Sequence, residues 1–274
     1  MIHIVLWLYV IVTLYPLLWA FNNSFKLHVD IISHPFALPT GELFTLKNYI
    51  DAWKTSHIDT YFFNSLYVSL VASTVCIVLA SMVSYAVTRM RYKKLNKIVM
   101  GVLLLALMVP GGALLVPLYT FILNFDFLGL KIYDTRGSLI LPYIAFGISL
   151  SVVIISAFIK SIPSELEEAG IMDGLSVYGL FWRIVLPLCG PALVTVFIIN
   201  FLGNWNEFIM AYLLVSKEKL RTLPVGMVAF RDALNANYGG MFAATMYSII
   251  PVAIIYAFLQ NKIIEGLTAG SVKG

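Results

Sequence analysis

The chain has 274 residues, of which 60% are hydrophobic and only 12% are charged, and its mean hydropathy is +0.90. A soluble domain of this length does not need so much apolar surface, so the composition indicates an integral membrane protein and excludes a soluble globular one. The formal charge of +4 is too small to indicate a nucleic-acid partner, and its distribution bears on membrane orientation instead.

The first two predicted spans enclose a polar segment. Residues 2–21 are long enough to cross a bilayer and lack both a basic start and a small-residue cleavage site, so a retained first helix is expected. Residues 22–60 are polar and predict a folded loop outside the membrane. Residues 62–87 form the second span, in which a small residue recurs at every fourth position, a spacing that lets helix backbones approach closely: Ala72, Cys76, Ala80 and Ser84. This face is expected to contact another helix.

A basic loop follows the second span. Between Arg89 and Lys97 the sequence places five basic residues and no acidic one. Loops on the cytoplasmic side of membrane proteins carry an excess of Lys and Arg. This loop is therefore predicted to be cytoplasmic.

Four further spans are predicted along the rest of the chain. The third, residues 98–123, is interrupted by Pro110-Gly111-Gly112 and by Pro117, and such breaks either kink a helix or line a translocation path. The fourth, fifth and sixth spans are predicted at residues 138–159, 192–215 and 241–264, with outer loops at 124–137 and 216–240 and an inner tail at 265–274. The prediction is an all-α membrane protein of one domain, residues 1–274, with six transmembrane helices and both termini in the cytoplasm.

A polar segment, residues 160–191, separates the fourth and fifth spans. Ser164, with Glu167 three residues later, predicts the capped start of a short helix, and Asp173-Gly174 suits its end because glycine readily adopts the left-handed conformation. A second helix is predicted from Ser176 until Pro187 and Pro191 interrupt it, with one apolar face formed by Val177, Leu180, Phe181, Ile184, Val185 and Leu188. Two short helices joined at a glycine predict a compact projection on the side of the basic loop.

The fifth span carries an unusual polar pattern. Asn200, Gly203, Asn204 and Glu207 follow i, i+3, i+4, i+7 spacing and are expected to share one helix face, with Trp205 and Asn206 close by. Polar side chains are costly inside a bilayer, so this face is expected to point into a bundle or an aqueous path. One interpretation is a path for a neutral, hydroxyl-rich solute such as a sugar, with Asn200, Asn204, Asn206 and Glu207 as candidate residues. The other is that these side chains hydrogen-bond to a neighbouring subunit and hold helices together.

Motifs for enzymatic chemistry are absent from the sequence. It has no phosphate-binding loop, no zinc-protease helix and no nucleophile elbow, so the chain is not expected to hydrolyse ATP or to bind a cofactor by itself. The four histidines lie at the N-terminus or in the first outer loop, and Cys76 and Cys189 have no metal-ligand spacing and are interpreted as packing residues.

Several of these residues resemble a known family. Glu168-Ala169-Gly170-x-x-Asp173-Gly174, followed by Phe181, Ile184, Leu186-Pro187 and Pro191, looks like the cytoplasmic EAA loop of permease subunits in bacterial binding-protein-dependent ABC importers. The resemblance narrows to the carbohydrate branch, the relatives of the maltose and glycerol-phosphate permeases, through Asn64-Ser65, Tyr85-Ala86, Leu141-Pro142-Tyr143, Trp205-Asn206-Glu207-Phe208, Thr222-Leu223-Pro224-Val225-Gly226 and the tail at 265–274. Two departures, Gly170 for the usual second alanine and Leu175 for a small residue, are expected to weaken the first helix, by about 1 kcal/mol for the glycine.

The resemblance implies the fold of a type I ABC importer permease and a set of partners. These are a second homologous permease subunit, a cytoplasmic ATPase dimer that holds ATP and magnesium, an extracytoplasmic solute-binding protein contacted by residues 216–240, a sugar substrate and the lipid of the bacterial inner membrane. It implies a coupling helix on one ATPase formed by Glu168, Ala169, Gly170, Asp173, Gly174 and Leu175, and a tail between the ATPase subunits that includes Gly266, Gly270 and Lys273.

The expected function is ATP-driven import of a sugar or oligosaccharide by alternating access. Three alternatives stand beside it. A permease for a non-sugar solute is disfavoured by the C-terminal tail, an intramembrane enzyme is disfavoured because Glu207 stands almost alone among acids in the spans, and a scaffold or receptor predicts no dependence of solute uptake on this chain.

Overall fold

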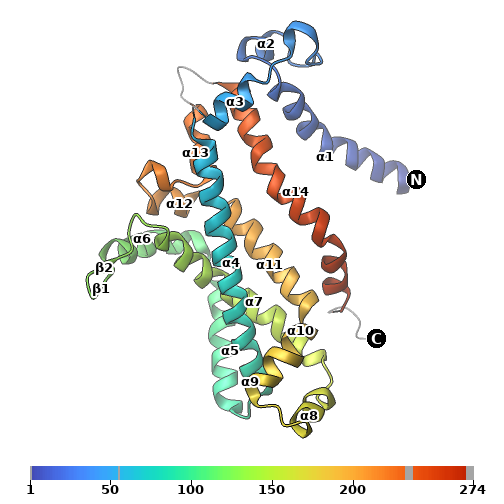
Figure 1. Ribbon diagram of the computed structural model, residues 1–274, viewed down its shortest axis with the longest axis vertical. Helices are drawn as coiled ribbons and strands as arrows, with labels where there is room; N and C mark the ends of the chain where they lie inside the picture. Colours follow the sequence, from blue (N-terminus) through green and yellow to red (C-terminus); the bar gives the residue numbers. More distant parts are fainter. Residues whose placement is uncertain (1, 55, 232–236, 270–274) are drawn as a thin grey trace. The chain divides into compact units, whose positions relative to one another are not determined.

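The computed structural model describes residues 2–54, 56–231 and 237–269, which are almost entirely helical (Figure 1). The chain divides into two compact units. Unit 1 comprises residues 1–64 and 218–253, and unit 2 comprises residues 65–217 and 254–274. The long helices α4 (Ile58–Arg89) and α14 (Tyr238–Ala269) each contribute to both units.

The described helices include between four and six candidate membrane spans. Four are long and apolar enough to cross a membrane alone, namely α1 (Ile2–Ser24), α4, α7 (Gly137–Ser161) and α14. Two bent pairs bring the number to six if each pair counts as one span. They are α5 (Lys93–Met108) with η2 (Gly111–Leu114) and α6 (Leu115–Asn124), and α9 (Val177–Leu180), η3 (Phe181–Val185) and α10 (Leu186–Leu188) with α11 (Gly190–Trp205).

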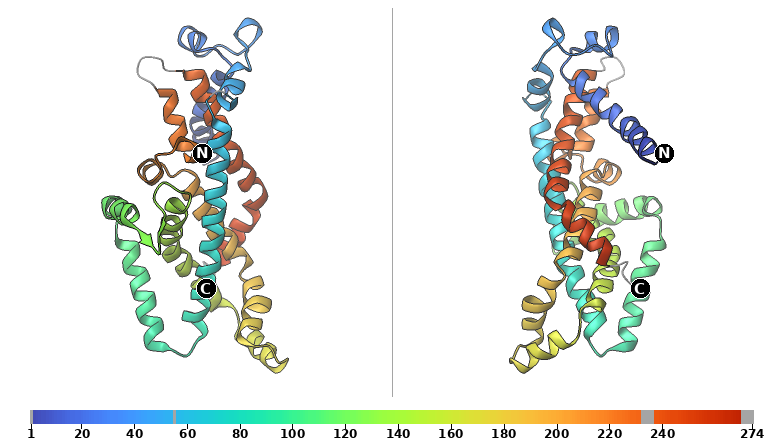
Figure 2. Two further views of the ribbon diagram at one scale, coloured as in Figure 1. Left: turned by 60° about the vertical axis from the view of Figure 1, so that its left-hand side comes forward. Right: turned by 90° about the vertical axis from the view of Figure 1, so that its right-hand side faces the viewer.

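The predicted interruption of the third span is confirmed at Pro110-Gly111-Gly112, whereas Pro117 lies in the first turn of α6 and does not interrupt it. Helix α5 ends at Met108, and the chain bends by 94° at the Pro110-Gly111-Gly112 segment before α6 (Figure 2). Proline has no N–H to continue the helical ladder, so the helix ends before it. The short loop that follows contains a hairpin, β1 (Asp126–Phe127) paired with β2 (Leu130–Lys131). The sequence did not reveal this hairpin because strands of two residues have no readable periodicity.

The small-residue face of α4 packs on α7, as the spacing predicted. Ala72, Cys76, Ala80 and Ser84 are all buried, and the Ser84 hydroxyl donates to the carbonyl of Val152 at 3.1 Å. Around this contact lies the apolar core of unit 2, which α4 and α7 share with the segment before α11: Ala80, Tyr85, Val152, Ile155, Ile159, Ile162, Phe181, Val185, Cys189 and Val196. The core therefore joins the polar segment 160–191 to two spans.

An acidic residue joins two loop segments of unit 2. The Asp134 carboxylate accepts hydrogen bonds from the backbone N–H groups of Ser216 and Lys217, both at 2.9 Å, and lies 3.5 Å from the Lys217 ammonium. Burial acts to raise the pKa of Asp134, but the hydrogen bonds and the lysine charge outweigh it, so the pKa lies below its usual value.

The polar segment at residues 22–60 is folded, as its polarity predicted. It contains α2 (His28–Ser33), η1 (Gly41–Leu43) and α3 (Lys47–Lys54) in unit 1. At its centre the Lys26 side chain is fully buried and donates to Asn23 Oδ1 at 3.1 Å and to the His34 carbonyl at 3.0 Å. Burial lowers the pKa of this ammonium, and the charge of Asp30 partly opposes that effect.

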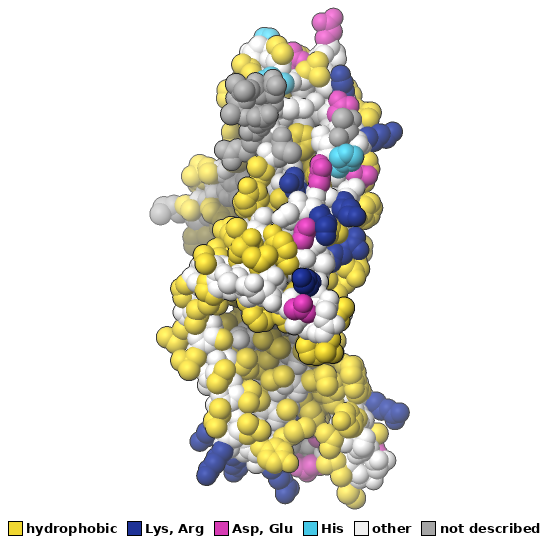
Figure 3. Space-filling view, turned by 90° about the vertical axis from the view of Figure 1, so that its left-hand side faces the viewer, with side chains coloured by type: hydrophobic (Ala, Val, Ile, Leu, Met, Phe, Trp, Pro, Cys, Tyr) yellow, Lys and Arg dark blue, Asp and Glu magenta, His cyan; other side chains and the backbone are white. Residues whose placement is uncertain are grey.

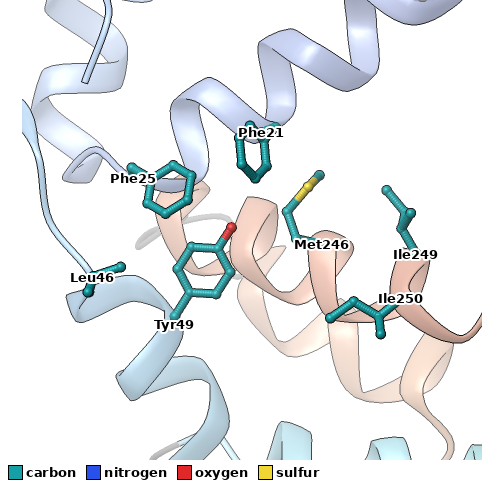
Figure 4. A pocket seen from close by; sticks show the side chains of 7 residues that line it. All are labelled: Phe21, Phe25, Leu46, Tyr49, Met246, Ile249 and Ile250. Carbon is teal, nitrogen blue, oxygen red and sulfur yellow. The ribbon is translucent and has the colours of Figure 1, made fainter. Parts of the chain in front are cut away.

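Unit 1 also contains an apolar pocket of about 440 Å³ (Figure 4). It lies between the end of α1, the start of α3 and the middle of α14, and is lined by Phe21, Phe25, Leu46, Tyr49, Met246, Ile249 and Ile250. The Tyr49 hydroxyl is already bonded to Ser24 Oγ at 2.7 Å. The pocket therefore offers no free polar group of these seven side chains to a hydroxyl-rich solute.

Candidate coupling surface and candidate solute path

The predicted projection begins with helix α8 (Glu165–Met172), which lies at the same end of unit 2 as the basic loop (Figures 1 and 2). The predicted cap by the Ser164 side chain is wrong. Ser164 has helical dihedral angles (φ −66°, ψ −25°) and makes no side-chain cap bond, whereas a capping hydroxyl needs an extended residue. Its carbonyl instead accepts from the N–H groups of Glu167 and Glu168, both at 3.0 Å.

The predicted end of α8 at Asp173-Gly174 is confirmed. Gly174 has φ +82°, its N–H donates to the Ile171 carbonyl at 2.9 Å, and the Leu175 N–H donates to the Gly170 carbonyl at 2.9 Å. This pair of bonds closes a helix with a left-handed glycine and reverses the chain direction. Glycine is required here by the backbone conformation and not by lack of space, since nothing lies within 4 Å of a Cβ atom added at this position.

The second helix of the projection differs from the expectation in two respects. Ser176 caps its start by accepting from the Gly179 N–H at 3.3 Å, but Phe181–Val185 then form a π-helical turn. The wider turn shifts the helical period, so Leu180, Phe181 and Val185 are buried while Val177 and Leu188 at the ends of the predicted face are exposed. Pro187 lies in the first turn of α10, where its missing N–H costs little, and the chain bends by 75° only at Cys189.

Gly170 permits close packing between the two helices. It is buried, and a Cβ atom at this position would lie 2.6 Å from Ile184 Cδ1 and 2.7 Å from Leu180 Cδ2. Glycine at this position lowers the intrinsic stability of α8, but it also lets α8 pack closely on the second helix. The departure from the family pattern therefore falls at a close contact between the two helices.

A buried ion pair fastens α8 to the spans. Glu167 is 8% exposed. Its Oε1 atom lies 2.6 Å from Nε of Arg89, at the end of α4, and its Oε2 atom accepts a hydrogen bond from the Tyr85 hydroxyl at 3.2 Å. Arg89 Nη2 also donates to the carbonyls of Ile159 and Ile162 at 3.0 and 2.7 Å, which end α7. One guanidinium thus joins α4, α7 and α8.

The sequence did not reveal this network. Arg89 appeared only as part of the basic loop, Tyr85 only as a family match, and Glu167 only as a helix-capping residue. Two features of the sequence could have indicated the pair. Glu167 lies in the first turn of a helix that follows one span, and Arg89 lies at the end of another span.

The outer surface of α8 is acidic and apolar. Glu168, Ala169, Asp173 and Gly174 are exposed, Leu175 is half-buried and Gly170 faces inward. Beside the two carboxylates lie exposed apolar side chains, Leu166, Ile171 and Met172, the last 87% exposed. Single exposed apolar residues are ordinary, but three on a helix of eight residues form a surface suited to a protein partner.

The expectation of one continuous polar face on the fifth span is wrong. Helix α11 ends at Trp205 and α12 (Ile209–Leu214) begins after a break, so Glu207 does not share a helix with Asn200 and Asn204. The Glu207 carboxylate accepts from the N–H groups of Met210 at 2.7 Å and Ala211 at 2.9 Å, and from the Tyr143 hydroxyl at 2.8 Å. A side chain that bonds to the backbone a few residues ahead starts a new helix and interrupts the old one.

The two asparagines of α11 bond within the chain. Asn200 is buried, and its Nδ2 donates to Ser151 Oγ of α7 at 3.0 Å and to the Val196 carbonyl at 2.9 Å. Asn204 Nδ2 donates to Ser73 Oγ of α4 at 3.2 Å. These contacts favour the helix-packing interpretation, with helices of the same chain in the place of a neighbouring subunit.

Asn206 differs from the other candidate path residues because its side chain is exposed, with Nδ2 donating to the Leu202 carbonyl at 2.9 Å. The side-chain oxygen Oδ1 of Asn206 accepts no hydrogen bond from the described residues.

Of the predicted tail residues, Gly266 lies in α14, whereas Gly270 and Lys273 lie outside the described residues.

The comparisons with known proteins identify the family. Residues 76–265 match the family described as "Binding-protein-dependent transport system inner membrane component". The chain belongs to this family. The permease is 36% identical over 274 residues to the probable ABC transporter permease protein YurM of Bacillus subtilis, covering 100% of this chain and 88% of YurM. It is 31% identical over 273 residues to the diacetylchitobiose uptake system permease protein NgcG of Streptomyces coelicolor, covering 99% of this chain and 88% of NgcG.

A solved structure confirms the predicted fold. A chain from a bacterial ABC transporter involved in the import of the acidic polysaccharide alginate matches the permease with a TM-score of 0.83 at 20% identity, over 95% of this chain and 94% of that one. The all-α permease fold of an ABC importer is therefore shown, and the relatives are named as permease proteins.

Proposed function

We propose that the permease carries a sugar or oligosaccharide across the cell membrane by alternating access, driven by separate ATPase subunits that bind α8. The observation that carries the proposal is the attachment of α8: a helix with an exposed acidic and apolar face is fixed to two spans through Arg89 and Glu167. A helix held in this way transmits a displacement of its partner to the spans, because packed elements move as units.

The coupling proposal gives separate roles to the residues of the projection. Glu168, Ala169, Asp173 and Gly174 would contact the ATPase through the exposed face, with Leu175 at its edge. Gly170 and Glu167 would hold α8 on the second helix and on the spans. ATP and magnesium would be bound by the ATPase dimer, and the tail with Gly266, Gly270 and Lys273 would reach between its subunits.

The substrate class rests on the relatives. A diacetylchitobiose permease and an alginate importer are among the proteins that the chain resembles, and both names refer to saccharides. Asn206, exposed in the break between α11 and α12, is the candidate path residue whose side chain remains available to a hydroxyl-rich solute. A permease for a non-sugar solute is the alternative.

The remaining partners follow from the family. A second homologous permease subunit would complete the path, and an extracytoplasmic solute-binding protein would deliver the sugar to the outer loops. The density of basic residues between Arg89 and Lys97 supports an orientation with this loop, α8 and both termini in the cytoplasm.

Uptake assays test the substrate class. A strain that lacks the chain, and the same strain carrying it on a plasmid, are compared for uptake of labelled mono- and oligosaccharides, an amino acid and phosphate. Uptake of one saccharide or a small group of them is expected to fall to background in the first strain and to return in the second. Restored uptake of the amino acid or phosphate, with every saccharide unaffected, would favour the alternative.

A further inference from the structure

A second pocket lies at the end of unit 2 that carries the basic loop. It has a volume of about 330 Å³ and lies between the end of α4, the start of α5 and the end of α7. Its polar wall contains Thr88, Asn96, Lys97 and Lys160, and its apolar wall includes Met100 and Leu104. None of these residues belongs to the coupling surface or to the candidate solute path.

The two lysines are the free charges of this pocket. Neither Lys97 nor Lys160 forms an ion pair with any residue that the structure describes, and Glu167, the buried acid nearby in sequence, is paired with Arg89. The other polar groups are already engaged: the Thr88 hydroxyl donates to the Ser84 carbonyl at 2.6 Å, and Asn96 Nδ2 donates to the Met90 carbonyl at 2.9 Å. Two ammonium groups thus face one pocket without an anion.

A neighbouring face of α5 is also apolar. It exposes Ile98, Val102 and Leu105, which are 63%, 59% and 64% exposed, beside the face that lines the pocket with Met100 and Leu104. Figure 3 shows Lys and Arg side chains gathered at this end of unit 2, next to a surface of hydrophobic side chains. The pocket therefore combines two cationic side chains with an apolar wall, next to an exposed apolar face of α5.

We propose that this pocket binds the phosphate group of an anionic phospholipid from the leaflet adjoining the basic loop, with its acyl chains along α5. Basic pockets between membrane helices on the cytoplasmic side suit anionic lipid headgroups, since the charge is matched and the chains remain in hydrocarbon. A free phosphate ion would leave the apolar wall unused, and so would a carboxylate from a docked protein. The site is independent of the transported solute.

Lipid titration of the purified transporter complex tests the site. Native mass spectrometry measures the apparent Kd for phosphatidylglycerol, with phosphatidylcholine as the neutral lipid. The double variant Lys97→Gln/Lys160→Gln is expected to raise this Kd about 30-fold, which corresponds to about 1 kcal/mol for each lysine. The matched control Lys93→Gln/Lys94→Gln removes the same number of positive charges from the basic loop and the start of α5, outside the pocket, and is expected to change the Kd by less than about twofold.

Two further arms separate the sources of the anion and guard against misfolding. Lys97→Arg/Lys160→Arg keeps both charges and is expected to bind phosphatidylglycerol as the unchanged complex does, and inorganic phosphate is expected not to displace the lipid. The proposal is overturned if the control variant weakens lipid binding as much as the pocket variant. It is also overturned if inorganic phosphate displaces the lipid, or if the pocket variant loses an ATPase subunit but keeps its lipid.

Discussion

Replacing Arg89 with alanine is expected to reduce solute uptake to background while the permease still reaches the membrane. The change removes the cation that pairs with Glu167 at 2.6 Å and the donor to the carbonyls of Ile159 and Ile162. Breaking a buried pair from one side leaves an uncompensated charge and costs about 3–5 kcal/mol. Helix α8 would then lose its polar attachment to α7 and keep only the Tyr85 hydrogen bond to α4, so ATP hydrolysis by the partner would no longer move the spans.

Two matched variants sharpen the Arg89→Ala prediction. Arg91→Ala removes an exposed arginine from the same loop and is expected to leave uptake unchanged. Glu167→Gln keeps hydrogen-bonding groups beside Arg89 and Tyr85 and is expected to give intermediate uptake. Uptake and ATPase activity are measured on the same membrane vesicles, and normal uptake by Arg89→Ala would refute the role of the ion pair.

Replacing Gly147 with alanine is expected to destabilise the crossing of α4, α7 and α11. A Cβ atom at Gly147 would overlap Asn200 Oδ1 and would lie 3.1 Å from Cys76 Sγ. Asn200 would have to move, which disturbs its bond to Ser151. Overpacking of this kind costs about 1–3 kcal/mol, so the apparent Tm of the purified permease is expected to fall by roughly 2–10 °C.

Gly203→Ala is the matched control for Gly147→Ala. Gly203 lies on α11 with nothing within 4 Å of an added Cβ atom, so the same substitution there is expected to keep or raise the Tm. Thermal unfolding in detergent compares the two variants. Equal melting of Gly147→Ala and Gly203→Ala would show that the close contact with Asn200 does not limit stability.

Features that depend on local backbone chemistry were predictable from the sequence. Gly174 ends α8 because glycine adopts the left-handed conformation at little cost, and the third span bends at Pro110-Gly111-Gly112 because proline cannot donate a helical hydrogen bond. The small residues of α4 were equally readable, since their spacing alone places Ala72, Cys76 and Ala80 on one face.

Features that depend on distant partners were not predictable in this way. The pairing of Arg89 with Glu167 requires the ends of α4 and α7 to meet, and no local pattern encodes that meeting. Glu207 matched a helical stripe by spacing, yet its carboxylate bonds to backbone N–H groups and interrupts the helix, because local polar bonds compete with helical ones. The π-helical turn at Phe181–Val185 likewise follows from packing against the spans, and it displaced the ends of the predicted apolar face.

The central claim is that the exposed face of α8 binds the ATPase, and cysteine cross-linking tests it most directly. Met172 is 87% exposed, whereas the native Cys76 and Cys189 are each 1% exposed, so a thiol reagent would react chiefly at Met172→Cys. A short cross-linker is applied to membranes with the complete transporter, and the attached subunit is identified by peptide sequencing. Met172→Cys is expected to link to the ATPase subunit, and Leu128→Cys, at an 89% exposed position in the β1–β2 turn, is expected not to. A link to the ATPase from Leu128→Cys, or none from Met172→Cys, would contradict the account.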